Sequence, residues 1–156
     1  MKFSDAVELL RSSSPKSRYL QEARRVVDRA RPYLVGDVPV INVTAHNLYL
    51  EKNRQVYTIP PSGVIITAHR NEYVTREYNR TRLIATENLP TEESLRELDA
   101  LESWFADERP VIVGSVISSQ AYPGRVYSMV PSRYQSNENG TVMRSDKFLT
   151  YVRNGY

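Results

Sequence analysis

Two short copies of one pattern contain both histidines of the chain. Residues 43–47 read VTAHN and residues 66–71 read ITAHRN, and these copies hold His46 and His69. Imidazole can bind a metal, act as a general base or hydrogen-bond a ligand. A zinc site needs three or four N, S or O ligands. Because the chain has no cysteine, no third histidine and no HExxH spacing, we expect no metal site and no cofactor.

A hydrolase is the second chemistry that these residues allow. His46 could act as the base for a nearby serine, with Ser62 and Ser115 among the candidates. Neither serine lies in a GxSxG elbow. Ser62 follows two prolines, which is typical of a turn, and Ser115 follows Gly114, which is typical of a helix cap. A small hydrolase that uses His46 and a nearby serine is therefore kept as an alternative.

Anion binding is the third chemistry. The sequence has neither a Walker loop nor GxGxxG, but the apolar run Val111–Val113 leads directly into Gly114 and Ser115. If a helix begins there, its free backbone N–H groups could receive an anion, with Arg125 as the counter-charge. The alternative is that Gly114 only permits close packing.

Short strands must position these residues. Val40–Leu50 and Gln55–Ile59 predict a hairpin, and residues 64–68 predict a strand that ends at the second TAH copy. Residues 72–86, rich in Tyr, Thr, Val and Arg, predict one or two exposed strands. Residues 135–140 predict a polar loop. Further strands are predicted at 111–113, 126–130 and 148–152.

Two helical regions complete the prediction. Thr91 can cap a helix over 91–107, whose leucines and aromatic residues form one apolar face. A basic helix over 15–31 carries a second apolar stripe. We therefore predict a helical N-terminal arm over residues 1–38 and a core domain over residues 39–156. The predicted fold class is α+β, with a mixed or mainly antiparallel sheet backed by helix 91–107.

Composition and charge narrow the class of protein. At 156 residues and 40% hydrophobic content, the chain suits one globular domain with an appended arm. The absence of cysteine fits a reducing compartment, and no apolar run approaches the ~20 residues that span a bilayer. We expect a cytoplasmic protein without membrane contact. The net charge of +3 lies in residues 1–38, which permits nucleic-acid binding but does not favour it.

Several segments resemble a family of small bacterial and phage proteins with the pattern INLTPH, IPPSG and IVS. The corresponding residues are 41–46, 59–63 and 111–113, followed by Pro123-Gly124-Arg125, Pro131 and the turn at 137–140. Ala45 stands where the family has proline, and Met143-Arg144-Ser145 stands where it has a cysteine. The resemblance implies that Asn42, Thr44 and His46 form a unit, that the loop 60–63 has a defined role, and that the chain is phage or bacterial, located in the host cytoplasm or the virion.

The sequence favours a non-enzymatic binding protein, such as a phage or bacterial accessory factor, with an anionic or nucleotide ligand. A structural or assembly protein, such as a virion component, is the alternative, since tyrosine and arginine favour interfaces. We expect a homo-oligomer held by the N-terminal arm. The predicted ligand-binding residues are Asn42, Thr44, His46, Ser62, His69, Arg70, Ser115 and Arg125.

Overall fold

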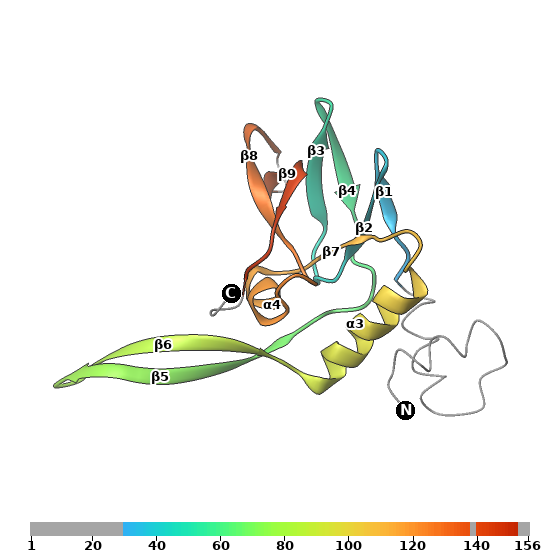
Figure 1. Ribbon diagram of the computed structural model, residues 1–156. Helices are drawn as coiled ribbons and strands as arrows, with labels where there is room; N and C mark the ends of the chain where they lie inside the picture. Colours follow the sequence, from blue (N-terminus) through green and yellow to red (C-terminus); the bar gives the residue numbers. More distant parts are fainter. Residues whose placement is uncertain (1–29, 138–139, 153–156) are drawn as a thin grey trace, which may run out of the picture.

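The protein is predominantly a β structure with three separate sheets (Figure 1). The computed structural model describes residues 30–137 and 140–152. It is 50% strand and 17% helix, with two helices among the described residues. The predicted α+β fold, one sheet backed by one helix, is therefore wrong. Non-strand segments at 43–47 and 60–67 divide the strands into groups that hydrogen-bond separately. The predicted arm helices lie outside the described residues, apart from the end of helix 15–31.

The first sheet joins the start of the described chain to its middle. Strand β1 (Tyr33–Val35) pairs antiparallel with β2 (Val38–Asn42), and β2 pairs in parallel with β7 (Val111–Val113). Gly36 occupies the intervening turn at φ +65°, where a residue with a side chain is disfavoured. The last residues of the segment predicted as the arm thus form a hairpin with the core.

The second sheet has the strand order β4-β3-β9-β8. Its β3 (Leu48–Lys52) and β4 (Gln55–Ile59) form a hairpin, as predicted, but the strand predicted over Val40–Leu50 is wrong, because β2 and β3 are separate strands of different sheets. Strand β9 (Gly140–Leu149) lies inside the sheet, parallel to β3 and antiparallel to β8 (Ser128–Asn137). The polar loop predicted over 135–140 is wrong at 135–137 and 140, which are strand, while residues 138–139 lie outside the described part of the chain. The edge strand predicted over 148–152 is also wrong, because β9 ends at Leu149 and lies inside the sheet.

The third sheet is a long two-stranded ribbon. Strand β5 (Ala68–Tyr78) pairs antiparallel with β6 (Thr81–Pro90), and the pair extends away from the rest of the molecule (Figure 1). The exposed strands predicted over 72–86 are confirmed. Residues 64–67, predicted as part of a strand, instead form a connection without strand pairing, in which Val64 and Ile66 are buried.

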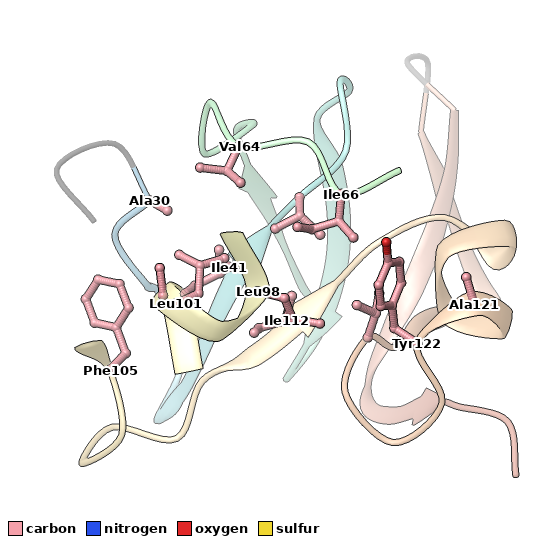
Figure 2. Packing of buried hydrophobic residues seen from close by; sticks show 13 residues of the cluster. Ala30, Ile41, Val64, Ile66, Leu98, Leu101, Phe105, Ile112, Ala121 and Tyr122 are labelled. Atoms are coloured by element: carbon pink, nitrogen blue, oxygen red, sulfur yellow. The ribbon is translucent and has the colours of Figure 1, made fainter. Parts of the chain in front are cut away.

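Two helices pack beside the first sheet. Helix α3 (Glu92–Trp104) begins at the predicted cap Thr91, whose hydroxyl accepts a hydrogen bond from Ser94 N at 3.2 Å. Helix α4 (Val116–Ala121) is a short helix with Ser115 as its cap. Figure 2 shows the main core, in which Leu98 and Leu101 of α3 lie near Ile41 and Ile112. Burial of such aliphatic side chains stabilises a fold by about 1.5–3 kcal/mol each. No helix in the described part of the chain is long and apolar enough to cross a membrane.

Candidate functional site

Asn42 organises the loop that carries the first TAH copy. Its side chain is 1% exposed, and its amide nitrogen donates to the carbonyl oxygens of His46 at 2.7 Å and Ile59 at 3.1 Å. Its amide oxygen lies 2.9 Å from the backbone nitrogen of Thr44 and 2.7 Å from the Thr44 hydroxyl. Asn42, Thr44 and His46 thus form one hydrogen-bonded unit, as the resemblance implied. His46 takes part in this unit through its backbone, and the residue as a whole is exposed.

The second TAH copy has a different structural setting. His69 and Arg70 lie at the start of β5, in the ribbon, and both are exposed. Strands β2 and β5 belong to different sheets, so the two copies are not paired strand ends. Arg70 Nε lies 4.0 Å from a carboxylate oxygen of Glu72. Within the described ranges, no group of three or more His, Cys, Asp or Glu side chains is placed to hold a metal ion.

Ser62 holds the IPPSG loop in place. Its backbone N–H donates to the carbonyl of Asn42 at 2.9 Å. Its hydroxyl lies 3.2 Å from the backbone nitrogen of Val64, closing a serine turn. These contacts join the loop to the end of β2, beside the Asn42 unit.

Gly114 and Ser115 have the structural roles that the sequence allowed as alternatives. A Cβ on Gly114 would lie 2.8 Å from Cγ1 of Val126, so glycine is required for close packing. The Ser115 hydroxyl accepts from Ser118 N at 3.0 Å and satisfies one free N–H of α4. Since α4 has only six residues, its N-terminus offers little further capacity for an anion.

Arg125 has two carboxylate partners on α3. Its guanidinium donates to Asp99 at 2.6 Å and also to Glu102. Partial burial alone would lower the pKa of Arg125, but the hydrogen bonds and charges of Glu102 and Asp99 outweigh burial and raise it. Its positive charge is therefore balanced within the molecule.

A Gly114→Ala variant should be destabilised by about 1–3 kcal/mol, because the added methyl overlaps the Val126 side chain in a closed part of the core. Urea denaturation followed by circular dichroism measures the change. Gly124→Ala is the matched control for a glycine without close neighbours, since a Cβ there meets nothing within 4 Å. Because Gly124 has φ +74°, the stability change of Gly124→Ala reports the cost of backbone strain alone. An unchanged midpoint for Gly114→Ala would contradict the packing role.

Two surface hollows do not bring the predicted residues together. One of about 490 Å³ is lined by Glu51, Lys52, Arg144 and Asp146 among others. Its charged side chains already have partners, because Arg144 forms two 2.7 Å bonds with Asp146, Lys52 lies 2.9 Å from Asp37, and Glu51 accepts from the Ser132 hydroxyl at 2.6 Å. The other, of about 420 Å³, lies between the end of α3 and β7 and contains Arg125 as its one predicted site residue.

The β5–β6 ribbon presents an exposed apolar surface. Five of its large hydrophobic side chains are 44–54% exposed, and these are Tyr73, Val74, Tyr78, Leu83 and Ile84. The register places Val74 opposite Ile84 on one face, and Tyr73 opposite Ala85 on the other. Sequence reasoning identified these strands as exposed but did not select them as a site.

The base of the ribbon is fixed to the body by Tyr122. Its hydroxyl donates to the carbonyl of Thr67 at 2.7 Å and accepts from the backbone N–H of Thr91 at 3.0 Å. These two residues adjoin the start of β5 and the end of β6. Ser94 Oγ also accepts from Thr67 N at 2.9 Å, and Ser118 Oγ donates to the Ile66 carbonyl at 2.8 Å. The ribbon therefore projects from a defined, hydrogen-bonded base.

The fold and these contacts define a class: a small, mainly β domain that projects a firmly rooted two-stranded ribbon. Comparisons with known protein families, with curated proteins and with solved structures found no match.

Proposed function

We propose that the protein is a non-enzymatic structural or assembly protein that binds a protein partner through the β5–β6 ribbon. The supporting observation is the ribbon itself, which carries exposed apolar side chains on both faces and extends away from the body (Figure 1). A lone two-stranded hairpin is marginally stable in water. Clustered exposed apolar side chains typically mark interaction surfaces. A partner that covers the ribbon would stabilise the hairpin and would also bury its exposed apolar side chains.

The charges of the ribbon favour a protein over an anionic ligand. Residues 68–90 contain four arginines and three glutamates. Arg82 lies 3.7 Å from Glu77, and the Arg76 guanidinium lies 5.7 Å from the Tyr78 ring centroid. Arginine and tyrosine beside apolar residues are typical of protein interfaces.

The anionic or nucleotide ligand stays a prediction with weaker support. Ser62, Ser115 and Arg125 each make contacts with neighbouring residues that account for their position. A thermal-shift screen with nucleotides tests this alternative, since a ligand that binds the folded state must raise the melting temperature. Oligomerisation through the predicted arm also stays a prediction, because the arm helices lie outside the described residues.

A double variant tests the assembly proposal. Tyr73→Ser with Leu83→Ser removes two exposed apolar side chains of the ribbon. Light scattering on protein isolated from its native extract should show complexes above the 18.0 kDa of one chain for wild type, and 18.0 kDa for the variant. The melting temperature of the body should change little, because these side chains lie outside both core clusters.

Leu34→Ser is the control for this experiment, since Leu34 is 60% exposed but lies on β1, away from the ribbon. It should keep the wild-type mass. A double variant that retains the wild-type complexes, or a wild-type protein that is always monomeric, would contradict the assembly proposal.

A further inference from the structure

We propose, resting on the proposed role of the ribbon, that its partner is a second copy of the chain. The two copies pair antiparallel through their β6 strands, so that two ribbons become one four-stranded sheet. The proposal follows from three properties of β6: its open edge, its self-complementary sequence and its register with β5.

The edge of β6 lacks the features that normally block strand addition. Natural proteins protect sheet edges with short strands, proline, bulges or lysine. Strand β1 has three residues, β4 is followed by Pro60, and β8 contains Pro131. Strand β5 has an irregularity at Thr75, between Val74 and Arg76. In contrast, β6 runs over ten residues with no lysine and no proline before its last position, Pro90.

The sequence of β6 complements itself about Ile84. Antiparallel pairing about a twofold axis that passes beside Ile84 places Ile84 opposite its own copy and Leu83 opposite Ala85. Arg82 then lies opposite Thr86 of the second copy, and Thr81 lies opposite Glu87. No pair brings like charges together, and each charged residue faces a hydroxyl.

Neighbouring registers are less favourable. Centring the axis on Ala85 would place Leu83 opposite the Glu87 carboxylate. Centring it on Leu83 would place the Arg82 guanidinium opposite Ile84. Either arrangement sets a charge against an apolar side chain at the middle of the contact, which carries a desolvation cost. Charge and polarity together therefore select the register centred on Ile84.

The pairing within each ribbon extends this complementarity across the whole sheet. Val74 is the β5 partner of Ile84, so the central row reads Val74, Ile84, then Ile84 and Val74 of the second copy. All four side chains are apolar, and those of Val74 and Ile84 are 54% and 45% exposed in one copy. In the adjacent row, Arg82 lies between Glu77 and Thr86 of the second copy. A four-stranded sheet with an apolar centre removes the instability of a two-stranded one.

Single cysteines test this arrangement cleanly, because the chain contains none. Directly opposed Cα atoms in antiparallel strands lie about 4.5–5.5 Å apart, within disulfide range. Under mild oxidation, Ile84→Cys should give a covalent dimer of twice 18.0 kDa on non-reducing gels. Thr86→Cys is the matched control on the same face of β6. Its two copies would lie roughly 14 Å apart and should remain unlinked.

A mixture of Arg82→Cys with the control variant Thr86→Cys determines the register of the two β6 strands. Arg82→Cys and Thr86→Cys should each give no disulfide-linked dimer when oxidised alone, and should form a disulfide only with each other. Absence of the Ile84→Cys dimer, or equal linking by Thr86→Cys alone, would overturn the pairing. If the Tyr73 and Leu83 double variant loses a complex with a different protein while Ile84→Cys stays unlinked, the pairing fails and the assembly proposal stands. If that double variant also changes nothing, both fail.

Discussion

An Asn42→Ala variant should lose about 2–4 kcal/mol of unfolding free energy, because the buried Asn42 side chain makes four hydrogen bonds that are lost together. The carbonyls of His46 and Ile59 would lose the Asn42 amide as a donor, although the His46 carbonyl keeps the Thr44 hydroxyl at 3.0 Å, and the N–H of Thr44 would lose its acceptor. The Asn42 side chain is 1% exposed, so water cannot readily take the place of its amide. Urea denaturation followed by circular dichroism measures the loss.

His46→Ala is the control, and it decides between the structural and chemical interpretations of the TAH pattern. Because His46 is exposed and contributes its backbone to the Asn42 unit, its replacement should change stability by no more than about 0.5 kcal/mol. A large effect of His46→Ala on stability, or a small effect of Asn42→Ala, would show that the loop is held by the imidazole instead.

Removing one hydroxyl from Tyr122 should loosen the whole ribbon. Tyr122→Phe keeps the ring, which is 2% exposed and packed in the main core (Figure 2), but leaves the Thr67 carbonyl and the Thr91 N–H without their partner. We expect a loss of about 1–3 kcal/mol. We also expect faster amide hydrogen exchange at the base of the ribbon, where β5 starts and β6 ends, because the base opens more often. Mass spectrometry measures this exchange.

Tyr127→Phe is the matched control, since Tyr127 joins β7 through its backbone N–H and carbonyl rather than through its hydroxyl. It should leave ribbon exchange unchanged. Equal exchange in wild type and Tyr122→Phe would show that Ser94 and Ser118 hold the base without the tyrosine.

Signals between near neighbours in the sequence determined the local elements. The Thr91 cap and the leucine spacing predicted α3, and the polar run over 51–54 predicted a turn that the structure narrows to residues 53–54 between β3 and β4. Asn53 and Arg54 have positive φ, at 53° and 65°, as a tight hairpin of this kind requires. The Tyr- and Arg-rich alternation over 72–86 predicted exposed strands. Each of these features depends on residues a few positions apart, so the sequence alone contains the relevant information.

The site residues had to be placed by the tertiary structure. Arg125 was predicted to face an anion, but the fold brings it to Asp99 and Glu102 on α3, which balance its charge. The two TAH copies look equivalent as sequence, yet one ends in a loop beside β2 and the other begins the ribbon. No local pattern distinguishes these outcomes, because they depend on which distant segment each residue meets.

Sheet membership and the ribbon base were likewise decided only by the fold. Strand-forming residues indicate a strand but do not specify its neighbour, so the sequence favoured one sheet where the structure has three. The Tyr122 hydroxyl reaches backbone groups 55 and 31 residues away in the chain. Such contacts exist only once burial of the core has brought α3, α4 and the ends of the ribbon together, since long-range pairing depends on collective packing rather than on local preference.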